Sequence, residues 1–288
     1  MKIGVNTLLW TAGFDREHLP LLPRLKEAGL DGVEVARFAF DGFPAAEIGR
    51  EIRREGLEVT FCSALTGRMS LASEDAQVRA SARDFLRQGI ETAAQIGARV
   101  FAGPFCSPVG YLPGRRRNED EWRWAVEGLQ SLGETLDRSN ITLAVEPLNR
   151  FETFFLNTAK DAVRLCDQVG HPRVGILFDT FHANIEEKDL GAALSSCGGR
   201  LKHIHACEND RGIPGSGHIE WPLVMAALGE LAYDGWLVIE SFGFAIPEIV
   251  AAACIWRDLA PTPDAIAFDG ARFLRRCIDR PLFAGRPK

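Results

Sequence analysis

Four short apolar segments of this chain end in residues of the types that bind divalent cations. They are Glu146 in AVEP, Asp179 in LFDT, His205 in HIHA and Glu240 in VIES. The run before each residue is typical of a buried strand. Consecutive members are roughly 30 residues apart, about the length of one strand-helix unit in a (β/α)8 barrel. Because such barrels do their chemistry at the carboxyl ends of their strands, the spacing predicts that all four lie on one rim and form a metal site in an enzyme.

The donor set indicates which ion would be preferred. Three carboxylates and one imidazole suit Mn2+, with Mg2+ or Co2+ as alternatives and Zn2+ less preferred. Taken singly, each residue could instead cap a helix or pair with an arginine. Burying three carboxylates together without a cation would be costly, however, so the joint interpretation is a metal site.

The elements that must position these residues alternate between strands and helices. Apolar periodicity indicates helices over Asp75–Ile96, Glu119–Asp137 and Trp221–Leu231, between short β-branched strands. This alternation predicts an α/β protein with parallel strands, a (β/α)8 TIM barrel in a single domain over residues 1–288. Helices expected over Pro247–Leu259 and Pro263–Ile278 give one helix more than the barrel requires, and we expect the extra one to close the bottom or flank an interface. The expected strands are Lys2–Asn6, Gly32–Ala36, Glu58–Ser63, Arg99–Gly103, Thr142–Glu146, Gly175–Asp179, Leu201–His205 and Trp236–Glu240.

Composition narrows the classes of partner. A formal net charge of -6 and a pI near 5.6 disfavour a nucleic-acid partner, which usually needs a basic face. No apolar run of about 18 residues or signal-peptide pattern occurs, so we expect no membrane segment. The seven cysteines are scattered singly, which suits a reducing compartment. Together these features predict a cytoplasmic protein.

Longer motifs of the chain resemble a known family. The segments EPLNRFE (146–152), LFDTFHANIEE (177–187), HIHACENDRGIPGSG (203–217) and IESF (239–242) are similar to those of the ketose 3-epimerases, the D-tagatose and D-psicose 3-epimerase group. The wider family is the xylose-isomerase-like barrel group. The resemblance runs through nearly the whole chain and implies an isomerase of carbohydrate metabolism that acts on a small-molecule ketose. It also implies a homodimer or homotetramer.

The same resemblance implies roles for individual residues. It makes Glu146, Asp179, His205 and Glu240 the metal ligands, and it places Glu152, His182 and Arg211 around the O1 to O3 end of the sugar. Inverting C3 through a cis-enediolate needs one group to remove a proton from one face and another to return it on the opposite face. Glu146 and Glu240 stand three strands apart in eight and could flank the ketose as this catalytic pair.

Other residues are less certain in role. Asn6, Trp10 and Glu34 follow early strands and are candidates for the pocket wall, although Glu34 has no partner that the sequence identifies. His203 should face the same side of its strand as His205, either as a hydrogen-bonded core residue or as support for the metal site. The connection 104–118 carries Arg115, Arg116 and Arg117, and it could be a substrate lid or simply a solvated loop.

The chain departs from the family pattern at two places near the far end of the sugar. The family commonly has an aromatic residue after the first strand, where this chain has Asn6 and Thr7, and a tryptophan in the loop after the fourth, where it has PFCSPVGY (104–111). We expect the smaller, more polar residues to alter the pocket for C4 to C6.

Three other functions compete with this hypothesis. The nearest is an aldose-ketose isomerase of the same superfamily, similar to hydroxypyruvate isomerase, which would move a proton between C1 and C2 and could work with one base. A DNA-repair phosphodiesterase on a related barrel needs further histidines on early strands, but the six here are His18, His171, His182, His203, His205 and His218. A non-catalytic carbohydrate-binding barrel would have no need of a complete metal site.

Overall fold

The computed structural model describes residues 1–279, so the last nine residues of the predicted domain, 280–288, lie outside the described residues. Within that range, eight parallel strands pair in chain order and β8 pairs with β1 to close the barrel. The predicted (β/α)8 barrel is therefore confirmed. The strands are β1 (Lys2–Asn6), β2 (Gly32–Ala36), β3 (Glu58–Cys62), β4 (Val100–Gly103), β5 (Thr142–Val145), β6 (Val174–Asp179), β7 (Leu201–His205) and β8 (Trp236–Ile239).

Helices surround the barrel because strands that are buried on both faces need cover on the outside. Every residue of β2 and β6 is buried. Three short 3-10 helices, η1 (Thr7–Leu9), η2 (Arg16–His18) and η3 (Gly198–Arg200), supplement the helical layer. The helices are α1 (Leu21–Glu27), α2 (Ala45–Arg54), α3 (Ala76–Ile96), α4 (Glu119–Gln130), α5 (Gly133–Ser139), α6 (Ala159–Val169), α7 (Thr180–Glu186), α8 (Leu190–Cys197), α9 (Trp221–Glu230), α10 (Pro247–Ala253) and α11 (Pro263–Asp279).

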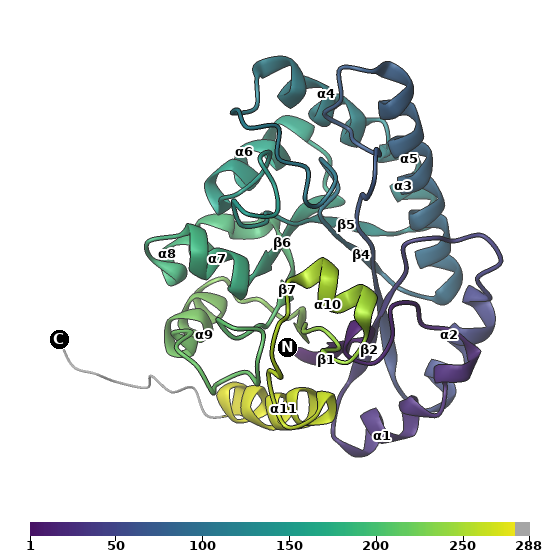
Figure 1. Cartoon of the computed structure of the whole chain (residues 1–288), viewed down its shortest axis with the longest axis vertical. Helices are drawn as coiled ribbons and strands as arrows, with labels where there is room; N and C mark the ends of the chain where they lie inside the picture. Colours follow the sequence, from purple (N-terminus) through teal and green to yellow (C-terminus); the bar gives the residue numbers. More distant parts are fainter. Residues whose placement is uncertain (280–288) are drawn as a thin grey trace.

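The two last helices have different places in the fold. The expected C-terminal helix is present as α11, which lies in the outer ring between α9 and α1 (Figure 1) and packs against β1 and β8. The additional helix is α10, and it lies over the mouth of the barrel instead of at its bottom. It is also shorter than expected, because Cys254 adopts a left-handed conformation with φ of 54° and ends it.

The helix expected over Glu119–Asp137 is broken into α4 and α5. The hydroxyl of Ser131 donates to the carbonyl of Gly128 at 2.7 Å, which competes with regular helical bonding, and Gly133, two residues further on, is a poor helix former. No helix among the described residues is both long and apolar enough to cross a membrane.

Candidate active site

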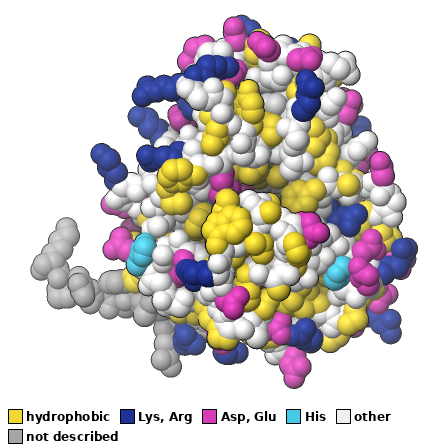
Figure 2. Space-filling view, viewed as in Figure 1, with side chains coloured by type: hydrophobic (Ala, Val, Ile, Leu, Met, Phe, Trp, Pro, Cys, Tyr) yellow, Lys and Arg dark blue, Asp and Glu magenta, His cyan; other side chains and the backbone are white. Residues whose placement is uncertain are grey.

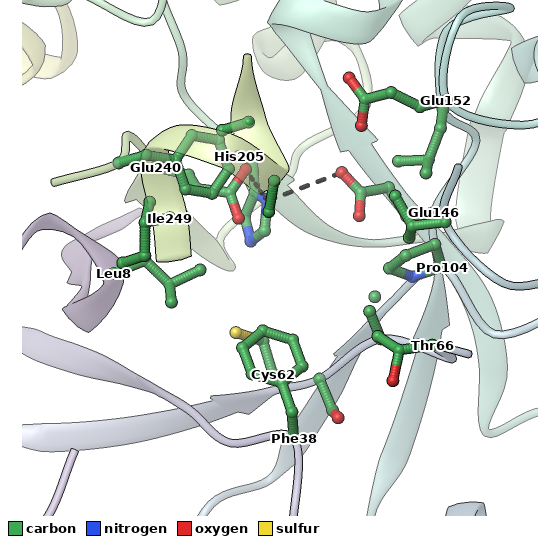
Figure 3. A pocket seen from close by; sticks show the side chains of 18 of the residues that line it. Leu8, Phe38, Cys62, Thr66, Pro104, Glu146, Glu152, His205, Glu240 and Ile249 are labelled. Atoms are coloured by element: carbon green, nitrogen blue, oxygen red, sulfur yellow. Dashed lines mark ion pairs between the residues drawn. The ribbon is translucent and has the colours of Figure 1, made fainter. Parts of the chain in front are cut away.

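The four predicted ligand residues come together at the carboxyl end of the barrel. Asp179 and His205 are the last residues of β6 and β7, and Glu146 and Glu240 directly follow β5 and β8. All four are buried, and one potential ligand atom from each lies within 4.8 Å of those from the others. Glu146 and Glu240 lie on opposite sides of His205 and point into the pocket (Figure 3).

This donor set fits a divalent cation. Oε1 of Glu146 and Nδ1 of His205 are buried without a hydrogen-bond partner. Nδ1 of His205 lies 3.2 Å from Oε2 of Glu240 and 3.8 Å from Oε1 of Glu146. Buried polar atoms normally have partners, and oxygen and imidazole donors this close together could share one ion.

Arg211 reaches the same cluster from the loop after β7. Its Nη1 donates to Oδ2 of Asp179 and to Oε2 of Glu240, each at 2.8 Å. The guanidinium lies 4.2 Å from the centroid of Phe181 and 5.0 Å from that of Phe242. Its backbone adopts φ of 63°, an uncommon conformation for a residue other than glycine, and the hydroxyl of Ser241 donates to its carbonyl at 2.5 Å. The loop therefore holds the buried guanidinium of Arg211 against the carboxylates of Asp179 and Glu240.

The other two residues that the resemblance assigned to substrate lie beside Arg211. Nε2 of His182 is 3.0 Å from Nη2 of Arg211, and its Nδ1 is 2.9 Å from Nδ2 of Asn149. The same amide group of Asn149 donates to Oε1 of Glu152 at 2.7 Å. Burial lowers the pKa of His182 to about 3 and raises the pKa of Glu152. Both side chains line the cavity that contains Glu146 and Glu240.

The two glutamates have different electrostatic surroundings. Burial raises the pKa of Glu146 well above its usual value, and the nearby carboxylates of Glu240 and Asp179 raise it further. Burial also opposes ionisation of Glu240, but the charges of His205 and Arg211 outweigh it and lower the pKa. The two carboxyl groups therefore differ in how readily they ionise, although they lie in the same site.

The three candidate wall residues lie elsewhere. Glu34 is fully buried within the barrel, where Asn6 donates to one of its oxygens at 3.0 Å, and Trp10 donates to Asp264 at 2.8 Å. None of the three is among the residues that line the pocket. Asn6 and Thr7 do not line the pocket, because their side chains bond to Glu34 and to the backbone of Ala36. Their effect on the region for C4 to C6 stays a prediction.

The cavity above the acidic cluster has a volume of about 350 Å3. Hydrophobic side chains gather around a hollow in the middle of this face, and charged ones lie mainly toward its edge (Figure 2). The loop 104–118 contributes Pro104 and Val109 to the lining, whereas Arg115 pairs with Glu121 and Arg117 with Asp161. The mouth of the cavity is lined by loops and by α10, and its larger apolar side chains include Leu8, Phe38, Val109, Leu148, Phe242 and Ile249, together with the carboxylate of Glu248.

Some residues that shape the site were missed from the sequence. Glu208 is fully buried and accepts hydrogen bonds from the backbone of Gly215 at 2.7 Å and Ile219 at 2.9 Å, and from Nε1 of Trp221 at 3.0 Å. It thereby ties together the loop that carries Arg211. The hydroxyl of Ser63 lines the cavity and is buried without a partner. Glu208 lies three residues before Arg211 in the motif ENDRG (208–212), and this closeness could have identified it from the sequence. No local pattern distinguishes Ser63.

The fold and the cluster define a class of protein, the (β/α)8 enzymes with an acidic cluster at the carboxyl end of the barrel. Residues 22–277 match the family model described as the xylose isomerase-like TIM barrel, and the chain belongs to this family. A probable ketose 3-epimerase from Synechocystis sp. is 37% identical over 96% of both chains. A D-psicose 3-epimerase from Agrobacterium fabrum is 30% identical over 93% of this chain and 94% of that one.

Solved structures agree with these relatives. An L-ribulose 3-epimerase superposes with a TM-score of 0.90 at 27% identity and covers 99% of each chain. A D-psicose 3-epimerase crystallised in the presence of D-fructose gives 0.87 at 28% identity and covers 96% of this chain and 99% of that one. The chain therefore belongs to the ketose 3-epimerase group of the family, and it is an enzyme of the isomerase class. The homo-oligomer implied by the resemblance stays a prediction.

Proposed function

We propose that this protein is a metal-dependent ketose 3-epimerase, which inverts C3 of a free ketose through a cis-enediolate with Glu146 and Glu240 acting on opposite faces. The observation that carries the proposal is the position of these two glutamates on either side of His205 at the floor of one cavity. The relatives named as epimerases of D-psicose and L-ribulose support a small ketose as the substrate.

The residues divide the chemistry among them. A divalent cation, for which this donor set favours Mn2+ over Mg2+ or Co2+, would be held by Glu146, Asp179, His205 and Glu240 and would stabilise the negative charge that develops on the substrate oxygens. One of the two glutamates removes the proton from C3, and the electron pair moves toward the C2 carbonyl. The other glutamate then returns a proton to C3 from the opposite face.

The neighbouring residues hold the reacting end of the ketose. Arg211 has guanidinium N–H groups that can donate to the C2 oxygen, where negative charge accumulates. Glu152 and His182 supply further hydrogen-bonding groups for the adjacent hydroxyls. The burial of these groups excludes water, which strengthens their interaction with the developing charge.

The decisive experiment is a panel of D-fructose, D-tagatose and L-ribulose assayed after chelation, with and without added Mn2+, and analysed by product chromatography. We expect the C3 epimers of these ketoses to form only when Mn2+ is present. Formation of aldoses instead would support the aldose-ketose isomerase, which moves the proton between C1 and C2. Unchanged turnover after complete chelation would contradict the metal-dependent reaction.

A further inference from the structure

Glu34 is a buried carboxylate that takes no direct part in the proposed reaction. It lies within β2, is fully buried and does not line the pocket. Four donors from three other strands converge on it. Asn6 of β1 at 3.0 Å and His205 of β7 at 2.8 Å contact Oε1, whereas Thr60 of β3 at 3.0 Å and His203 of β7 at 2.7 Å contact Oε2.

The contact between Glu34 and His205 determines which nitrogen of the His205 ring is free. A carboxylate can only accept a hydrogen bond, so Nε2 of His205 must carry the proton that points to Glu34. The other nitrogen, Nδ1, faces Glu240 and Glu146 and has no hydrogen-bond partner. When the ring binds a cation in place of a proton, this orientation presents the Nδ1 lone pair to the cluster.

His203 contacts the other oxygen of the Glu34 carboxylate. It precedes His205 by two residues on the same strand, and both rings point into the barrel toward Glu34. Each oxygen of Glu34 is thereby occupied by one histidine and one smaller polar side chain, which fixes the plane of the carboxylate. His203 is thus a hydrogen-bonded residue of the barrel core, as the first alternative expected, and its bond to Glu34 is the contact through which it could also support the metal site.

We propose that Glu34 is a positioning residue of the metal centre, which fixes the ring orientation and tautomer of His205 so that Nδ1 is the ligand atom. The inference rests on the proposed function, because it assigns Glu34 a task only if His205 binds a cation. A carboxylate that accepts from the distal nitrogen of a ligand histidine also makes the ligand nitrogen more basic. Removing such a partner typically weakens metal binding by about 10- to 100-fold.

Glu34, His203 and His205 also form a compact set of potential ligands of their own. The separations of 2.7 and 2.8 Å between Glu34 and the two rings are those of charge-assisted hydrogen bonds. The proposal therefore predicts one Mn2+ per chain. A stoichiometry of two would place a second ion between these residues and overturn the hydrogen-bonded arrangement.

The test compares Mn2+ binding in Glu34→Gln and Thr60→Val, measured by competition with a fluorescent chelator. A glutamine has only one acceptor oxygen and no charge, so one histidine must face an amide N–H, and we expect the Mn2+ Kd to rise by about 10- to 100-fold. Thr60→Val removes a donor to the oxygen that His205 does not use, and its Kd should change by less than about threefold. Saturating Mn2+ should restore most of the kcat of Glu34→Gln, which it would not do if Glu34 only stabilised the fold.

Equal Mn2+ affinities in the wild type and Glu34→Gln would overturn the proposal. If Glu34→Gln does not fold, Glu34→Asp keeps the charge but withdraws the carboxylate from His205, and it should show the same direction of change. A wild-type protein that binds no Mn2+, or that binds it without acting on ketoses, would instead refute the proposed function. The two failures are thereby distinguishable.

Discussion

At the floor of the pocket, polar side chains extend from strand ends and hydrogen-bond to one another, whereas the mouth consists mainly of apolar side chains carried by loops and by α10, with Glu248 of α10 as a charged exception. Asp179 is held by Arg211 and also accepts from the backbone of Phe181 at 2.7 Å at the start of α7. Ile249, by contrast, lies on α10 and offers only its hydrocarbon surface to the cavity. From this difference we propose that the floor determines the reaction and the mouth determines which ketose is accepted.

Removing either of the two carboxylates that we propose to be catalytic should have the largest effect. We expect Glu240→Gln and Glu146→Gln each to lower kcat/KM by at least about 100-fold, because loss of a general acid or base typically costs 100- to 10,000-fold. The thermal midpoint and circular dichroism should show that the fold survives. Glu58→Gln is the control, since Glu58 pairs with Lys2 at the exposed start of β3. Epimerisation at the wild-type rate in either floor variant would reject the two-glutamate reaction.

Glu208 tests whether the floor depends on residues behind it. In Glu208→Gln the new amide must place an N–H against one of the donors from Gly215, Ile219 or Trp221, so the loop that carries Arg211 should shift. We expect kcat/KM to fall by about 10- to 100-fold, a loss of about 1.4 to 2.7 kcal/mol in transition-state stabilisation.

A matched control lies on the same loop. Asp210 is half-buried, pairs with Arg257 and accepts from the backbone of Gly212 at 2.9 Å. Because asparagine keeps an acceptor oxygen for Gly212 and loses only a surface ion pair, Asp210→Asn should change kcat/KM by less than about threefold. Steady-state kinetics on both variants make the comparison. Equal losses in the two variants would mean that Glu208 has no special role in placing Arg211.

The mouth should give the smallest effect on the reaction but a measurable effect on selectivity. Ile249→Ala removes apolar surface from the cavity wall, and we expect the ratio of kcat/KM for a hexulose over a pentulose to change by up to about tenfold. Val250→Ala, on the same helix but outside the cavity lining, is the control. A loss of activity with Ile249→Ala as large as that of the floor variants would contradict the division between floor and mouth.

The sequence predicted the floor because its signals are local. A buried strand that ends in Glu, Asp or His is visible in a short window, and the regular spacing of such ends places them on one rim. This is why Glu146, Asp179, His205 and Glu240 were predicted together and are found together.

The remainder depends on contacts between distant segments. Glu34 meets His203 and His205 across 169 and 171 residues, so its partners could not be recognised from any local pattern. The mouth combines loops after several strands with α10, and the sequence could not show that the side chains of Asn6 and Thr7 bond inside the barrel and do not line the pocket. The break between α4 and α5 was missed because the hydrophobic periodicity continues past Ser131 while the hydrogen bonding does not.

The most direct test of the account is solvent deuterium exchange at C3 of the ketose, followed by NMR in D2O with metal-depleted and Mn2+-loaded protein. We expect the Mn2+-loaded enzyme to produce the C3 epimer with deuterium at C3 and none at C1, and the metal-depleted enzyme to leave the ketose unchanged. Deuterium at C1, or exchange at C3 that is equally fast without the metal, would contradict a reaction in which two metal-binding glutamates act on opposite faces of C3.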